Sequence, residues 1–274
     1  MRSYIRQLTV IGAAGAMLAC APTVQQEVQI GEQYSAEIER TMPMITDSRA
    51  VSAFNSSVAP LKNVVRRKDL PWEFRIVNSD QVNAFAVPGG HIYVFRGLIE
   101  RADHWDEFAG ALAHEIGHVD LRHSAEQMGQ ASAANTGLTL AYILLGRQPG
   151  TAEQIAVNVA GGAIFAKFSR DDEREADSMA VAYMTEARID PSGLTRMFRQ
   201  LQSLGARDPS KVELWFSSHP MPEERITNVD RYINSTPGAS AAVRTGRTDL
   251  SAFSTLQARL RALPDAPKEV QQSN

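Results

Sequence analysis

The sequence of 274 residues lacks four features: a second cysteine, an excess of basic residues, an internal repeat, and an apolar run of about 20 residues that would cross a bilayer. With Cys20 alone, the chain cannot form an internal disulfide, so its fold must depend on a hydrophobic core. The formal net charge of −3 gives no support to a nucleic-acid partner, which requires a basic surface. The absence of repeats argues against a repeat-built binding module.

The first 20 residues have the organisation of an export signal. Arg2 and Arg6 form a short basic start, and the apolar stretch LTVIGAAGAMLA follows them at residues 8–19. This length fits a signal-peptide core better than a bilayer span. We therefore expect residues 1–19 to be a cleaved signal peptide.

The end of this stretch, MLAC at residues 17–20, resembles the lipobox of bacterial lipoproteins, although that pattern prefers a small residue in place of Leu18. The resemblance implies lipidation of Cys20 and attachment to a membrane by an N-terminal lipid anchor. Because Ala21 is not acidic, it also implies sorting to the periplasmic face of the outer membrane. The alternative is an ordinary cleaved signal, a buried Cys20 thiol and a soluble periplasmic protein.

Apolar residues recur at helical spacing along most of the chain, and one β-rich region interrupts them. The pattern predicts two helices between residues 30 and 65, divided near 43–47, and further helices at 96–102, 105–127, 171–188, 191–204, 222–233 and 250–263. It predicts strands at 72–77, 84–87 and 91–95, the last two forming a hairpin around Pro88-Gly89-Gly90. The expected fold class is α+β, mostly helical, with a small antiparallel sheet beside the helix at 105–127.

The composition also divides the chain into regions. We expect a tether at residues 20–29, one domain at 30–235, and a linker, a C-terminal helix and a frayed tail at 236–274. The stretch 127–168 is almost free of charge and rich in alanine, glycine and leucine. We interpret it as a helical hairpin packed on the functional face of the domain; the alternative is a pair of segments that dip into a membrane.

The segment HEIGH, residues 114–118, carries the clearest chemical signal. On a helix, His114 and His118 lie on one face about one turn apart, so both imidazoles can bind the same metal ion. Glu115 is placed to act as a general base toward a water beside that metal. Small and apolar neighbours indicate that the helix is buried, where a metal ion offsets the cost of these polar groups. The alternative is a hydrogen-bonded pair of core histidines.

A catalytic zinc site needs a third protein ligand. The metzincin spacing would require glycine at Leu121 and histidine at Ser124, and His123 is one position too early. The remaining source is a carboxylate from FSRDDEREAD, residues 168–177, where Glu173 and Asp177 share a helix face. One of them suits the metal and the other a hydrogen bond to a ligand histidine. The alternative is a charged, solvated helix surface.

Four separate motifs resemble one family: NAFAVPGGHIYV at residues 83–94, HEIGH, SRDDEREAD, and SSHPMPEERI at 217–226. The chain is similar here to the zinc metallopeptidases that include the CAAX prenyl endopeptidases and the bacterial proteases HtpX, BepA and LoiP. The resemblance implies a gluzincin-like domain with one Zn²⁺ bound by His114, His118 and Glu173, with Asp177 behind the ligands. It places His219 near the zinc, either stabilising the oxyanion or as a fourth ligand, and Arg225 near Asp177.

The expected function is zinc-dependent endopeptidase activity on misfolded or unassembled envelope proteins. Zinc would activate a water, Glu115 would accept its proton, and the strand near residues 83–87 would pair with an extended or unfolded substrate. Outer-membrane assembly machinery is an expected partner. The alternatives are a latent or chaperone-like assembly factor whose zinc is masked by His219, and an aminopeptidase. His91 and His104 are expected to have structural roles.

Overall fold

The computed structural model describes residues 22–127, 167–220 and 223–267. The expected signal peptide, Cys20 and nearly all of the uncharged stretch 127–168 lie outside the described residues. Within those residues, no helix is both long and apolar enough to cross a membrane.

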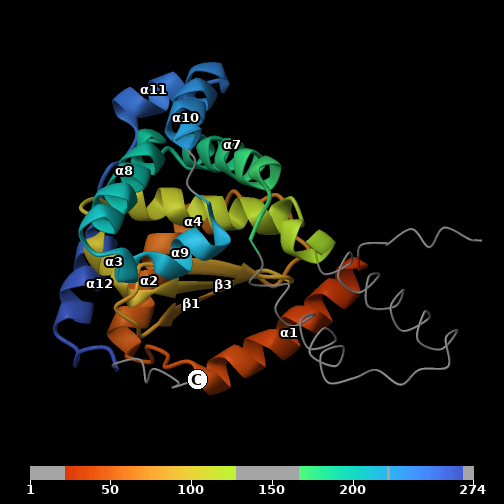
Figure 1. Cartoon of the computed structure of the whole chain (residues 1–274), viewed down its shortest axis with the longest axis vertical. Helices are drawn as coiled ribbons and strands as arrows, with labels where there is room; N and C mark the ends of the chain where they lie inside the picture. Colours follow the sequence, from red (N-terminus) through yellow and green to blue (C-terminus); the bar gives the residue numbers. More distant parts are fainter. Residues whose placement is uncertain (1–21, 128–166, 221–222, 268–274) are drawn as a thin grey trace, which may run out of the picture.

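The described chain is mostly helical with one three-stranded sheet, which confirms the expected fold class (Figure 1). The strands are β1 (Glu73–Val77), β2 (Ala84–Val87) and β3 (His91–Phe95). The helices up to the gap are α1 (Val24–Thr41), α2 (Ser48–Lys62), α3 (Arg96–Arg101) and α4 (Trp105–Asp120). Those after it are α7 (Arg170–Glu186), α8 (Ser192–Arg207), the 3₁₀ turn η2 (Pro209–Lys211), α9 (Glu213–Ser218), α10 (Glu224–Ser235), α11 (Ala239–Thr245) and α12 (Ser251–Arg261).

Helices cover both faces of the sheet. Successive side chains of β3 point to opposite faces, and all of them are apolar or buried, so both faces must be covered. Ile92 and Val94 belong to the main core, which also contains the apolar side chains of α4. Tyr93 and Phe95 belong to a second cluster on the other face, which Ile38 of α1 completes. Figure 1 shows α4 above the sheet and α1 below it. The central strand is therefore buried on both sides, and it fixes α4 in the middle of the molecule.

The sheet is mixed, so the prediction of a wholly antiparallel sheet was wrong for one strand pair. The hairpin is as expected, with β2 antiparallel to β3, but β1 is parallel to β3 in the order β1-β3-β2. Residues 78–83 connect β1 to β2, which is not its neighbour in the sheet. β3 then lies between these two strands and pairs with both. The turn uses Gly89 and Gly90, whose φ angles of 86° and 94° favour glycine.

Helix α4 ends at Asp120, seven residues before the predicted end at 127. Arg122 has φ 66°, in the left-handed region, which ends the regular helix before residues 123–127 become helical again. The apolar periodicity continues across this break, and for that reason the sequence pattern could not show it.

In the structure, the chain is already helical from Val24 onward, within the expected tether at residues 20–29. A capping box between Thr23 and Gln26 starts α1. Glu27 is only 1% exposed, and its carboxylate binds the guanidinium of Arg67 at 2.7 and 3.0 Å. The start of α1 is thereby joined to the loop that precedes β1.

The predicted linker after residue 235 also contains a helix, α11, which the small polar residues of that region concealed. Ala239 and Ala242 are buried, and burial rather than composition decides this element. The predicted C-terminal helix is present as α12, and Phe253, Leu256 and Leu260 belong to the main core.

Replacing Glu27 by alanine is expected to destabilise the protein by about 1–3 kcal/mol, because Arg67 would be left largely buried without its carboxylate. The measurement is urea-induced unfolding followed by far-UV circular dichroism. The exposed Glu32 of the same helix provides the control, since Glu32→Ala removes the same charge without a buried partner. Equal stabilities of the two variants would show that α1 does not depend on this ion pair.

Candidate metal centre

Helix α4 presents His114, Glu115 and His118 from the centre of the molecule, and all three are fully buried. The helix packs along α7 and α8. Gly117 permits the contact with α7, because a Cβ at this position would lie 3.1 Å from the Ala176 carbonyl oxygen. The HEIGH segment therefore combines the chemical groups with the small residue that brings the neighbouring helix close.

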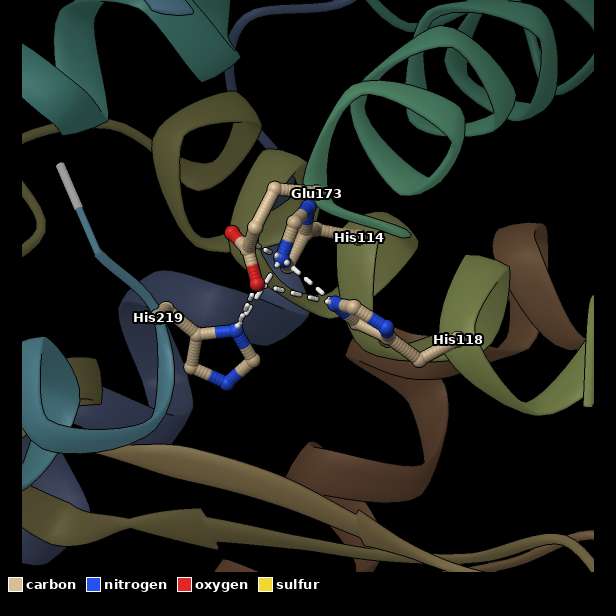
Figure 2. A group of neighbouring side chains, drawn as sticks. All are labelled: His114, His118, Glu173 and His219. Atoms are coloured by element: carbon tan, nitrogen blue, oxygen red, sulfur yellow. Dashed lines mark hydrogen bonds and ion pairs between the residues drawn. The ribbon is translucent and has the colours of Figure 1, made fainter. Parts of the chain in front are cut away.

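Two further groups reach the same point from distant parts of the chain. Glu173 comes from the first turn of α7, and His219 follows the end of α9. One ligand atom from each of His114, His118, Glu173 and His219 lies within 4.8 Å of the others (Figure 2). We call these four residues the metal cluster. Figure 2 shows their side chains converging on one point between α4, α7 and His219.

The ring nitrogens of the two α4 histidines have divided roles. Nε2 of His114 and Nε2 of His118 lie 3.0 Å apart and both face the cluster. Nδ1 of His114 lies 2.9 Å from Oδ1 of Asp177, one turn after Glu173 on α7. A carboxylate at Nδ1 favours the tautomer with its proton on Nδ1, which leaves the Nε2 lone pair free for a metal.

Arg225 of α10 binds two carboxylates of α7, those of Glu173 and Asp177. Its guanidinium donates to Asp177 at 2.8 and 2.6 Å, and its Nη1 lies 2.6 Å from Oε2 of Glu173. Burial raises the pKa of Asp177, but the positive charge and hydrogen bonds of Arg225 outweigh it and lower the pKa. For Glu173, burial is likewise outweighed, here by the charges of His219 and Arg225, and its pKa is well below the ordinary value. Both carboxylates are thus ionised at neutral pH.

The Glu115 carboxylate is placed differently. Burial raises its pKa above the ordinary glutamate value. Among the described residues, neither carboxylate oxygen has a hydrogen-bond partner, and Nε2 of His219 lies 3.3 Å from Oε1. A buried carboxylate with a raised pKa and no hydrogen bond to the described residues is suited to accept and return a proton.

The pKa values of the two remaining histidines of the cluster are shifted in opposite directions. Burial lowers the pKa of His118 well below the ordinary value, so that its ring is neutral and able to bind a metal. Burial also acts on His219, but the negative charges of Glu115 and Glu173 outweigh it and raise the pKa. Nδ1 of His219 lies 3.0 Å from Oε1 of Glu173 and 3.4 Å from Nε2 of His114. The nitrogen nearest the other ligands is therefore Nδ1.

The cluster fits a zinc ion by its donor set. Three imidazole nitrogens and one carboxylate oxygen are typical zinc ligands, and four ligands match its usual tetrahedral coordination. The residues that the sequence singled out for this site lie together in the structure: His114, Glu115, His118, Glu173, Asp177, His219 and Arg225.

Two residues beside the cluster had not been assigned to it. The ring of Phe168 stacks on that of His118 with 3.8 Å between centroids, and His123 lies 2.9 Å from the outer nitrogen of His118. The only available signal was position: Phe168 ends the uncharged stretch 127–168, and His123 lies shortly before it, after the HEIGH segment. His91 and His104 lie beside Glu73 and Asp249, respectively, and neither is in the cluster.

A comparison with protein families agrees with this geometry. The model of peptidase family M48 matches residues 48–233, which include the strands, α4, α7 and His219. The chain belongs to peptidase family M48. The expected resemblance to a zinc metallopeptidase family is thereby confirmed, and the His/His/Glu/His cluster is the feature of the structure that suits a metallopeptidase of this family.

Three relatives illustrate the range of the M48 family. The chain is 30% identical over 220 residues to the beta-barrel assembly-enhancing protease of Escherichia coli K12, which covers 77% of this chain and 45% of that protein. It is 32% identical over 163 residues to metalloprotease YcaL of the same organism, with 58% and 61% covered, and 28% identical over 165 residues to the mitochondrial metalloendopeptidase OMA1 of Schizosaccharomyces pombe, with 60% and 48% covered. The match spans about half the length of the first of these relatives.

Proposed function

We propose that this M48 protein is a zinc-dependent endopeptidase, with zinc bound by His114, His118 and Glu173. The observation that carries the proposal is the buried metal cluster with a buried glutamate beside it, whose carboxylate oxygens have no hydrogen-bond partner among the described residues. A structural metal site has no physical need for a buried carboxylate that is not itself a ligand, whereas peptide hydrolysis needs a base at this place. The catalytic domain is proposed to span residues 30–235.

The residues of the chain divide the chemistry among them. A bound zinc ion would supply Lewis acidity toward water and toward the carbonyl of the scissile bond. Glu115 accepts the proton of the attacking water and passes it to the leaving amine. Asp177 holds His114 by Nδ1, and Arg225 holds Asp177 and Glu173 in their ionised forms.

The edge of the sheet is the proposed place for the substrate backbone. β2 is one of the two edge strands of the described sheet, and it packs against α4, which carries the HEIGH segment. An extended polypeptide added to this edge would pass the metal in a fixed register, which favours cleavage within unfolded segments. We propose misfolded or unassembled envelope proteins as substrates and outer-membrane assembly machinery as a partner; the name of the first relative, a beta-barrel assembly-enhancing protease, supports a role in assembly.

A second candidate follows from His219. Catalytic zinc sites keep one position open, and the fourth member of the cluster would close it. We infer that His219 holds the enzyme latent when its Nδ1 is on the metal, and that the chain then serves as an assembly factor without cleavage. If His219 instead stabilises the oxyanion, its Nδ1 or Nε2 has to face the substrate. A metal with all four cluster residues as ligands has no open position for that substrate.

Replacing His219 by alanine is expected to raise casein cleavage at least severalfold, because three protein ligands and an open position remain. Zinc content, measured by atomic emission on the same samples, should stay at one ion per chain. The matched control is His104→Ala, which removes a half-exposed histidine outside the cluster. A fall in cleavage with zinc retained would instead assign His219 to oxyanion stabilisation.

Lipidation of Cys20 is part of the proposal, with the protein anchored at the periplasmic face of the outer membrane. In a diderm host fed radioactive palmitate, the wild type should incorporate label and the Cys20→Ser variant should not, because only the thiol can accept the lipid. Density fractionation of membranes then locates the labelled protein. A labelled protein in the inner membrane would contradict the sorting, and an unlabelled wild type would favour a soluble periplasmic protein.

A further inference from the structure

We propose that His123 is the positioning residue for His118, holding the ring so that its Nε2 faces the metal, and that Glu175 in turn anchors His123. The inference rests on the proposed zinc site and adds the residues that orient its second histidine. It starts from an asymmetry in the cluster: His114 is held directly by a buried carboxylate, whereas the described structure places another histidine behind His118.

The contacts form a chain that leads away from the cluster. Nδ1 of His118 lies 2.9 Å from Nδ1 of His123, and Nε2 of His123 lies 3.3 Å from Oε2 of Glu175. Figure 2 shows that the second ring nitrogen of His118 points away from the other three ligands. His123 is 3% exposed, whereas the Glu175 side chain is 63% exposed.

Metal binding selects one arrangement of the protons along this chain. If Nε2 of His118 offers its lone pair to a metal, the single ring proton of His118 is on Nδ1. That proton can be donated only to an unprotonated Nδ1 of His123, which places the His123 proton on Nε2. The Nε2–H then donates to the Glu175 carboxylate. Each donor in this series therefore has an acceptor. If both hydrogen bonds ran in the opposite direction, the ring proton of His118 would be on Nε2, the nitrogen that faces the metal.

The break at the end of α4 makes this contact. In a continuous helix, His123 would lie on a different face from His118, because five residues exceed one turn by more than a quarter turn. The left-handed Arg122 turns the chain so that the His123 ring returns to His118, where the two rings lie 5.0 Å apart at 72°. The Phe168 ring stacks on the face of the His118 ring, with 3.8 Å between the ring centroids. His118 is therefore fixed by an edge contact and a face contact.

The test is the dissociation constant for zinc, measured by competition with a chromogenic chelator on the full chain. His123→Phe keeps a ring but removes both hydrogen bonds, and it is expected to weaken zinc binding roughly 10- to 100-fold. His123→Asn retains an acceptor close to the place of Nδ1 and should recover most of the affinity. His104→Asn is the control, because His104 is a histidine outside the cluster, and the zinc affinity of this variant should equal that of the wild type.

A second readout separates positioning from a general loss of stability. In ¹⁵N spectra of the zinc-loaded protein, the Nδ1–H of His118 should be protected from exchange in the wild type and in His123→Asn, and unprotected in His123→Phe. If His123→Phe fails to fold, Glu175→Ala takes its place, because this side chain is mostly exposed; a smaller rise in the dissociation constant is then expected, with Asp171→Ala of the same helix as control.

The outcomes distinguish this inference from the proposed function. A wild type that binds one zinc, together with unchanged affinity and unchanged Nδ1–H protection in the His123 and Glu175 variants, overturns the positioning role and leaves the zinc site intact. A wild type that binds no zinc overturns both. Weaker binding in His123→Phe with recovery in His123→Asn supports the chain of contacts from His118 to Glu175.

Discussion

Glu115→Gln is expected to abolish peptide cleavage while zinc remains bound at one ion per chain. Glutamine has nearly the same shape but cannot accept the proton of the attacking water, and loss of a general base costs roughly 10²- to 10⁴-fold in rate. The raised pKa of Glu115 and its two oxygens without hydrogen-bond partners among the described residues are the basis of this expectation. Because Glu115 is not in the metal cluster, its loss removes no ligand.

This experiment is best done in two backgrounds, since a latent wild type would cleave too slowly for a further loss to be measured. Glu115→Gln is therefore combined with His219→Ala, and casein cleavage is compared with that of His219→Ala alone. The exposed Glu32 supplies the control, because Glu32→Gln is the same chemical change far from the site. Cleavage that survives Glu115→Gln in both backgrounds would remove Glu115 from the mechanism.

Replacing Arg225 by methionine is expected to destabilise the fold by about 3–5 kcal/mol, the range for breaking a buried ion pair by removal of one partner. Arg225 is 1% exposed, and its loss leaves the buried Asp177 carboxylate without its cation and Glu173 with one fewer. The measurement is urea-induced unfolding of the zinc-loaded protein. Arg231→Met on the same helix is the control, because Arg231 is exposed.

A second variant tests whether charge explains this loss. Adding Asp177→Asn to Arg225→Met removes one of the two stranded charges and should restore part of the stability, which gives a non-additive double-mutant cycle. Strictly additive effects would show that the arginine acts through packing, for instance through its contact with the Phe198 ring at 4.4 Å, rather than through the carboxylates.

The local part of the site could be predicted from the sequence, because helix geometry alone relates its members. His114 and His118 share a face at i and i+4, and Glu173 and Asp177 do so on the next helix. His219 and Arg225 are far from these in sequence, and only the resemblance to a family placed them near the metal. No local pattern relates residue 219 to residue 114.

Topology and local breaks were beyond the sequence pattern for physical reasons. Alternation along a strand shows which side chains share a face but not the direction of its neighbour, so the parallel pairing of β1 with β3 could not be derived. The small residues of α11 look like a linker until two buried alanines are seen. His123 was noted only as a failed metzincin ligand, because the left-handed Arg122 that returns it to His118 leaves no mark on the periodicity.

The central claim is that the metal cluster binds one zinc ion and that this ion serves peptide hydrolysis. The most direct measurement is zinc content by atomic emission beside casein cleavage, for the wild type, His219→Ala, Glu115→Gln and the double variant. We predict one zinc per chain in all four, with cleavage highest in His219→Ala and absent wherever Glu115 is replaced. The claim would be contradicted if no variant contained zinc, or if casein cleavage were the same with and without zinc and with and without Glu115.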